Sequence, residues 1–197
     1  MLITYLRSSS YSRWDWCPHA YYLEYVLGMK SPANQKADAG NITHKALELL
    51  ARKKLAAQRW EPTFVEDETG EEFDTGSFTP ATAIDWAWHY FTTIKVPHHF
   101  WTDGHRRDCE RWMTTVLDHN DGQFSPLKRT IVAPEQYFDL TVPREWARYG
   151  YTLPDGSYLR GCLGLKGTMD LVTRVDHDTI EYVDYKTGRR VDWATGK

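Results

Sequence analysis

Two aspartates and a lysine near the end of the chain have the residue types and the spacing that metal chemistry requires. They lie in "GTMDLVTRVDHDTIEYVDYKTG", residues 167–188, where Asp170 and Asp184 each interrupt an apolar run typical of a buried β-strand. If the turn between the runs is centred on His177, the two aspartates are equally far from it along the chain. In an antiparallel hairpin they then face each other directly, with Cβ atoms about 4.5–5.5 Å apart.

Two carboxylates at this separation repel each other, and a half-buried sheet strengthens the repulsion. A divalent cation between them removes it, and hard oxygen ligands suit Mg²⁺ or Mn²⁺. Lys186 lies two residues after Asp184, so strand alternation places it on the same face. There it could neutralise a phosphate or activate a water. Tyr185 points to the other face, but its backbone carbonyl stays near the metal side.

A purely structural interpretation stays open. Asp184 and Lys186 could be solvent-facing strand residues, with Asp170 at a strand edge, and a slip of one residue would undo the pairing. The otherwise apolar "IEYVDYK" and the second aspartate at the matching position favour the metal site.

Three stretches of the chain resemble the PD-(D/E)XK nuclease superfamily, and more closely its RecB-like branch. This branch includes the nuclease domains of RecB and AddB and the RecB-like exonucleases of CRISPR and phage systems. "SYSRWDWCPHAYYLEYVLG" is similar to its opening motif, in which two serines precede C-P-x-x-Y. "GNITHKALELLA" is similar to its G-x-x-x-H-x-x-L-E helix, and "GTMDLVTRV…YVDYKTG" to its G-x-x-D…D-Y-K-T-G core. The order and rough spacing also match, from Ser10 to Gly188.

The resemblance implies a nuclease with a Mg²⁺ or Mn²⁺ ion that lowers the pKa of a water attacking a phosphodiester in line. It implies these catalytic residues: Asp170, Asp184, Lys186 and Glu135, the last in "APEQYFDL". It implies these metal ligands: His44 on a helix, Asp170, Asp184, Glu135 and the backbone carbonyl of Tyr185.

Several of these residues have simpler explanations. A single histidine such as His44 on an amphipathic helix is often a surface or capping residue, and Glu135 could be an exposed strand residue with Asp139 in its place. Some RecB-like enzymes hold an iron–sulfur cluster with a cysteine at the position of Cys17 and three more near the C-terminus. No such trio is present here, so we expect no iron–sulfur cluster in this chain and a buried thiol at Cys17.

Basic residues around this segment could contact a nucleic-acid backbone, namely Lys166, Arg174, Lys186, Arg189 and Arg190. We expect Thr187 to bind nucleic acid as well. Arg189 and Arg190 could equally be a solvated tail. Arg13, with Trp14 and Trp16, could guide a single strand, although core packing is the more common role of tryptophan.

The composition limits the function classes. The net charge of −3 and the pI near 6.2 exclude a global basic field, so nucleic-acid binding would need a local patch. Three separated cysteines without a C-x-x-C argue against disulfides and a structural zinc site, and favour the cytoplasm. We expect no signal peptide and no contact with a membrane, because "MLITYLRSSS" lacks an apolar core and no apolar run approaches the length of a span.

The helical elements are expected in the first part of the chain. Residues 8–28 should be helical, capped by Ser10 or Ser12, divided at Pro18 and ended by Gly28. The stretch 31–40 should be a loop, and the acidic stretch 61–79, which lacks Lys and Arg, an exposed loop. The other expected helices cover 41–58, 81–94 after Thr79-Pro80, and 103–119.

The strands are expected last, at 130–142, 162–175 and 179–186. This predicts an α/β or α+β fold, and with the resemblance a restriction-endonuclease-like core in which helices flank a mixed central sheet. We expect one nuclease domain over 1–197, with a mainly helical part at 1–120 and a β-rich catalytic core at 121–197. The branch normally continues with a Q-x-x-x-Y helix, which we expect to be missing because the chain stops at Lys197.

The leading functional hypothesis is a metal-dependent DNA nuclease, most simply an exonuclease of recombination, repair or phage DNA processing. Its partners would be single-stranded DNA or duplex ends, together with a helicase, a recombinase or another DNA-processing protein. The alternative is a non-catalytic module on a degenerate nuclease fold that binds nucleic acid or a protein. A metal hydrolase acting on a small substrate is a third hypothesis, which no motif supports.

Overall fold

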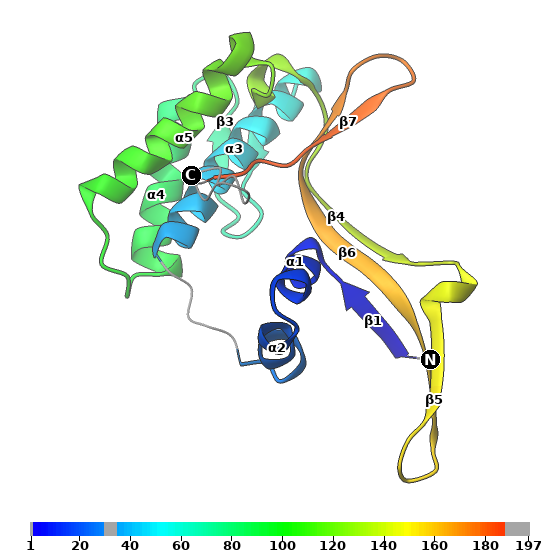
Figure 1. The fold of residues 1–197 in the computed structure, drawn as a ribbon. Helices are drawn as coiled ribbons and strands as arrows, with labels where there is room; N and C mark the ends of the chain where they lie inside the picture. The colour runs from blue at the N-terminus through cyan, green and yellow to red at the C-terminus, as the bar shows by residue number, and fades with distance from the viewer. Residues whose placement is uncertain (1, 30–34, 188–197) are drawn as a thin grey trace. The chain divides into compact units, whose positions relative to one another are not determined.

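The longest strand of the fold, β6 (Tyr158–Arg174), is the centre of a mixed five-stranded sheet. The computed structural model describes residues 2–29 and 35–187. In it β6 pairs in parallel with β1 (Leu2–Leu6) and antiparallel with β5 (Arg148–Thr152) and β7 (Ile180–Val183), and β4 (Thr130–Thr141) is also its neighbour (Figure 1). The predicted class, helices flanking a mixed central sheet, is confirmed.

The chain divides into two compact units. Unit 1 comprises Met1–Pro32 and Tyr137–Thr168, and unit 2 comprises Ala33–Gln136 and Met169–Lys197. The single nuclease domain expected from the sequence stays a prediction.

Unit 1 contains an N-terminal strand that the sequence analysis did not predict, β1, which aligns Leu2 with Gly161 of β6. Helix α1 (Ser8–Trp16) follows, then α2 (Pro18–Tyr21) and a π-helical turn (Tyr22–Val26). The predicted division at Pro18 is confirmed. The predicted caps are wrong, because α1 begins before both serines, and Ser10 instead accepts a hydrogen bond from the backbone N–H of Arg7 at 2.9 Å. Unit 1 also contains a 3-10 turn at Glu145–Ala147.

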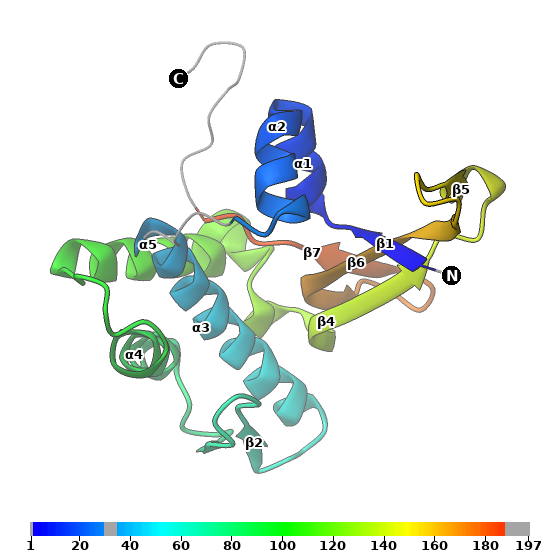
Figure 2. The same ribbon diagram turned by 90° about the horizontal axis from the view of Figure 1, so that it is seen from below.

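Unit 2 is built around helix α3 (Gln35–Gln58), which packs against α4 (Pro80–Tyr90) and α5 (Asp103–Gly122) (Figure 2). A π-helical turn (Phe91–Lys95) extends α4, and a 3-10 turn (Pro126–Lys128) follows α5. Helix α4 begins as predicted, because the hydroxyl of Thr79 accepts the N–H of Thr82 at 3.1 Å. Part of the loop expected at 31–40 is helical instead, because α3 already begins at Gln35.

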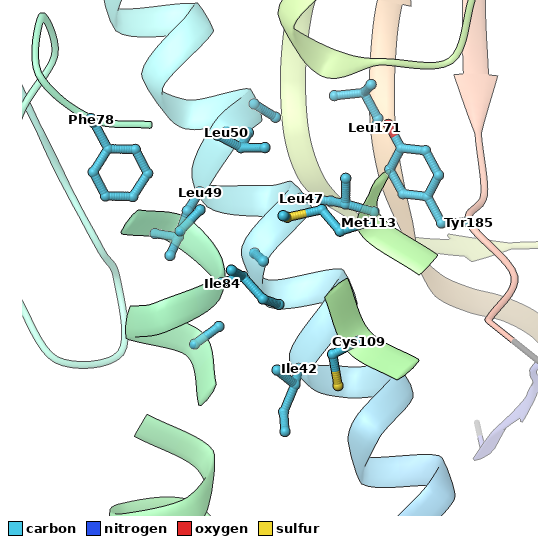
Figure 3. Close-up of a cluster of buried hydrophobic side chains, with 14 of the residues drawn as sticks. Ile42, Leu47, Leu49, Leu50, Phe78, Ile84, Cys109, Met113, Leu171 and Tyr185 are labelled. Atoms are coloured by element: carbon cyan, nitrogen blue, oxygen red, sulfur yellow. The ribbon is translucent and has the colours of Figure 1, made fainter. Parts of the chain in front are cut away.

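A continuous apolar core holds the three helices together (Figure 3). Four residues of α3 are almost completely buried in it, namely Ile42, Leu47, Leu49 and Leu50. Ile84 of α4, Cys109 and Met113 of α5, Leu171 of β6 and Tyr185 join them. This core occupies one side of α3, and the polar residues described below lie along another side of the helix.

The prediction of an exposed loop at 61–79 is wrong. Strands β2 (Thr63–Val65) and β3 (Glu72–Asp74) form a hairpin there, and three phenylalanines at 64, 73 and 78 cluster with ring centroids 4.9–5.5 Å apart. Glu66 is fully buried. Burial alone would raise its pKa, but the Lys45 ammonium, 2.6 Å away, and the N–H groups of Glu68 and Thr69 lower the pKa to about 2. The run contains no Lys or Arg of its own, so it was predicted to be solvated; its cation, Lys45, comes from helix α3.

Replacing Lys45 should destabilise the protein strongly. Lys45 is itself buried and lies 2.9 Å from Glu48 as well as 2.6 Å from Glu66, so Lys45→Ala removes the ammonium partner of fully buried Glu66 and leaves buried Glu48 with Arg52. We expect the free energy of unfolding to fall by about 3–5 kcal/mol in urea denaturation. Lys36→Ala, an exposed position on the same helix, should change it by no more than about 0.5 kcal/mol. Equal effects of the two substitutions would contradict this account.

Candidate active site

Helix α3 presents one polar face to a cleft of unit 2. Asp38, Asn41, Lys45 and Glu48 recur at intervals of three or four residues, which places them on one side of the helix, and His44 lies beside them. The cleft has a volume of about 420 Å³ and is also lined by Glu135 of β4 and Asp170 of β6. Three elements that are distant in sequence thus contribute side chains to one hollow.

The β6–β7 hairpin has the predicted register. Leu171 is paired with Val183 and Val172 with Tyr182, which centres the turn on His177. The pairing ends there, however, because β7 stops at Val183 although the strand was expected to continue to 186. Asp170 and Asp184 therefore occupy the next position beyond the last regular pair, Leu171 with Val183.

Asp170 is held on both of its carboxylate oxygens. Its Oδ1 lies 3.3 Å from Nδ1 of His44, and its Oδ2 accepts the backbone N–H of Tyr185 at 2.6 Å. The ring of Tyr185 is buried, meets the His44 ring edge to face, and donates its hydroxyl to the carbonyl of Phe124 at 2.9 Å. These contacts fix the position of Asp170 and orient His44 toward it.

Asp184 and Lys186 lie apart from this group. They form an ion pair with each other at 2.6 Å, and their side chains are 60% and 80% exposed. They line a separate hollow with Phe124 and Tyr182, not the cleft that contains Asp170. The reason is local: Tyr185 turns its ring into the core, and its two neighbours therefore point outward. The structure brings together His44, Glu135 and Asp170 and leaves the other two predicted residues outside.

Glu135 combines an unusual backbone with an unusual charge environment. Its φ of 46° lies in the left-handed region, which a non-glycine residue adopts rarely and at a cost of about 1–3 kcal/mol. Burial, followed by the negative charges of Glu48 and Asp170, raises the pKa of its carboxyl group to about 7. A carboxyl that is expensive to ionise and held in a strained conformation is typical of a functional site.

Sequence reasoning missed five charged residues that line the cleft: Asp38, Lys45, Glu48, Glu68 and Lys95. Glu48 follows His44 by one helical turn, and this spacing could have identified it. Its two oxygens are bound by Lys45 at 2.9 Å and by Nε of Arg52 at 2.6 Å. Glu68 and Lys95, which pair at 2.9 Å, have no local signal because the fold alone brings them together.

The donor types around the cleft suit a hard divalent cation, since they are carboxylates and one imidazole. A cation would also relieve the repulsion that raises the pKa of Glu135. Within residues 2–29 and 35–187, no three His, Cys, Asp or Glu side chains form a group that could hold a metal ion as they stand. The chemistry of the donors therefore fits a metal, but the site is not preformed.

The predicted nucleic-acid contacts are partly described. Arg13 of α1 pairs with Glu24 at 2.8 Å and lies over the ring of Trp16, 5.1 Å from its centre. Trp14 and Trp16 are more than half exposed, so core packing is the wrong role for them. Arg189 and Arg190 lie outside the described residues.

Other predicted positions lie as follows. Arg174 donates to the carbonyl of His177 at 3.1 Å, and Cys17 is only half-buried, where its sulfur accepts the N–H of Ala20 at 3.5 Å. Asp139, the alternative to Glu135, is exposed and accepts the hydroxyl of Tyr137 at 3.2 Å.

Thr187 passes close to the start of α3. A Cβ atom added at Gly40 would come within 2.5 Å of the Thr187 hydroxyl oxygen. Glycine at position 40 therefore provides the space through which the chain passes after Lys186, and this gives a physical reason for a glycine four residues before His44.

Comparison with known proteins gives one match. A family model described as the PD-(D/E)XK nuclease superfamily matches residues 8–195. Comparisons with curated proteins and with solved structures gave no match. Among the helices of the described residues, none has both the length and the apolar character needed to cross a membrane.

The raised pKa of Glu135 should make stability depend on pH. A carboxyl whose pKa rises on folding stabilises the folded state below its ordinary pKa of 4.5, and this contribution is lost as the pH rises through about 7. Glu135→Gln removes the penalty, so at pH 8 its free energy of unfolding should exceed that of the wild type by about 1–3 kcal/mol. The difference should vanish below about pH 4.5 in urea denaturation. Glu72→Gln, at an exposed position, should leave the profile unchanged; a parallel shift by both variants would refute the assignment.

Proposed function

The chain belongs to the PD-(D/E)XK nuclease superfamily, and on that premise we propose that it is a metal-dependent deoxyribonuclease that hydrolyses phosphodiester bonds. The observation that carries the proposal is the convergence of His44, Glu135 and Asp170 on one acidic cleft. A scaffold has no need for mutually repelling carboxylates at this place, whereas a cation site does.

The residues that would hold Mg²⁺ or Mn²⁺ are His44, Glu135, Asp170, the backbone carbonyl of Tyr185 and, once its side chain turns inward, Asp184. The ion would supply Lewis-acid polarisation of the phosphate and a water of lowered pKa. Asp170 is already oriented by His44 and by the N–H of Tyr185. Lys186, released from Asp184, would place a positive charge beside the phosphate on which negative charge develops.

The finer assignments are part of the proposal. The motifs around Cys17, His44 and Lys186 support the RecB-like branch, and with it an exonuclease of recombination, repair or phage DNA processing. Its partners would then be single-stranded DNA or duplex ends and a helicase, a recombinase or a similar protein.

A second candidate is a non-catalytic module that binds nucleic acid or a protein. The observation that favours it is the position of Asp184 and Lys186, which are paired with each other outside the cleft. In such a module the acidic cleft would need no cation.

Cleavage should require both the cleft and the lysine. End-labelled single- and double-stranded DNA should be cut with Mg²⁺ or Mn²⁺ and left intact with chelator. Asp170→Ala and Lys186→Ala should each lower the rate at least about 100-fold, because one removes an oriented ligand and the other a charge at the phosphate. Asp178→Ala, on the exposed turn of the same hairpin, should stay within about twofold of the wild type. Unchanged cleavage by the first two variants would overturn the proposal.

Cation binding separates the enzyme from the module. In calorimetry with Mn²⁺, the wild type should bind, and Asp170→Ala or Asp184→Ala should weaken binding at least about tenfold. Asp178→Ala again serves as the control. Absence of binding that depends on Asp170 and Asp184, in folded protein, would favour the module.

A further inference from the structure

Unit 1 has a composition unlike that of the whole chain. Nine of the twelve tyrosines lie within Met1–Pro32 and Tyr137–Thr168. The same segments contain seven Lys and Arg residues and five Asp and Glu residues, a net charge of +2, against −3 for the whole chain. Tyrosine and positive charge thus concentrate in unit 1, whereas the residues of the cleft belong to unit 2.

The strand pair β5–β6 spreads its tyrosine rings flat across the sheet. A Cβ atom added at Gly150 would come within 2.3 Å of the Tyr158 hydroxyl, and one added at Gly161 within 2.1 Å of the Tyr149 ring. Each glycine therefore provides the surface on which a tyrosine of the neighbouring strand lies. Tyr158 is nevertheless 58% exposed, so its ring is available for stacking.

Two arginines share the face of Tyr158. The register pairs Gly150 with Arg160 and Arg148 with Cys162, and directly paired residues lie on the same side of an antiparallel sheet. The guanidinium of Arg160 lies 5.3 Å from the centre of the Tyr158 ring. Both arginines and Tyr158 line a hollow of about 650 Å³. This volume is within the range of small-molecule sites and suits a nucleotide.

A third cation continues the same face. Strand alternation puts Lys166 on the side of Arg160, about 20 Å further along β6. Its ammonium lies 4.0 Å from the centre of the Tyr5 ring of β1. Among the described residues, no ion pair includes Arg148, Arg160 or Lys166. A carboxylate, Asp139, is hydrogen-bonded to the Tyr5 side chain, over whose ring the Lys166 ammonium lies.

We propose that this face of unit 1 binds single-stranded nucleic acid, with a base stacked on Tyr158 and phosphates at Arg148, Arg160 and Lys166. Three cations along an extended line, which form no ion pair with the described carboxylates, complement a phosphate backbone. An exposed ring at one end of this line, beside Arg160, suits an unstacked base, which a single strand offers and a duplex does not. This face would be a second nucleic-acid-binding surface of the proposed nuclease. Its role in holding the substrate rests on the proposed function, whereas the binding itself does not.

The test is binding without cleavage. Fluorescence anisotropy with a labelled oligothymidylate of about 20 nucleotides, in chelator, should show salt-dependent binding by the full chain. Tyr158→Ala should weaken it about 5- to 100-fold, while Tyr158→Phe, which keeps the ring, should stay within about twofold. Arg148→Ala/Arg160→Ala should weaken it at least about tenfold and reduce the slope of log Kd against log salt by about 1.4.

The matched control is Arg59→Ala/Arg107→Ala, which removes two exposed arginines elsewhere and should leave binding within about twofold. Circular dichroism should show that all variants are folded. Binding of the duplex as tightly as the single strand, or equal loss in both double-arginine variants, would overturn the proposal. So would unchanged binding by the Tyr158 and Arg148/Arg160 variants, because these side chains would then not hold the strand. Because the binding assay contains chelator, it does not depend on cleavage. Loss of this proposal would therefore leave the nuclease activity to be tested separately by the cleavage assay.

Discussion

The carboxylate of Asp170 is the point on which the cleft depends. It is bound on one oxygen by the imidazole of His44 and on the other by the N–H of Tyr185, so it joins helix α3, strand β6 and the segment after β7. Each partner is held in turn, His44 by a helix whose opposite face is core and Tyr185 by its buried ring. The apolar core of unit 2 thus determines where the polar chemistry lies, as expected when a site is supported by rigid elements.

Charge balance is the second constraint. Carboxylates outnumber lysines among the residues that line the cleft. Buried Lys45 offsets part of this negative charge by binding Glu48 and Glu66. For Glu135, burial and then the negative charges of Glu48 and Asp170 outweigh the opposing influence of His44 and Lys45, and raise the pKa of its carboxyl group to about 7. The acidic β2–β3 hairpin therefore supports the cleft, because its Glu66 holds the ammonium of Lys45 in place.

The sequence predicted the parts that local rules govern. The hairpin register followed from two aspartates equally spaced from His177, and the start of α4 followed from Thr79-Pro80. It failed where distant segments supply the partner: the acidic stretch 61–79 is ordered by aromatic packing and by Lys45. The same limit applies to the site. The resemblance named His44, Glu135 and Asp170, which lie at one cleft, but spacing also placed Asp184 and Lys186 beside Asp170, and it did not predict that β7 ends at Val183.

That early end divides the proposed cation ligands into a rigid half and an adaptable half. Moving Asp170 would break two interactions next to the core, whereas among the described residues Asp184 is held by an exposed ion pair with Lys186, worth about 0–1 kcal/mol. Beyond Val183 it also has no strand register to preserve. Ligands of this kind adjust to the radius of the ion they meet, so a cation would be selected here by the hardness of its ligands and its demand for coordination geometry, not by a cage of fixed size.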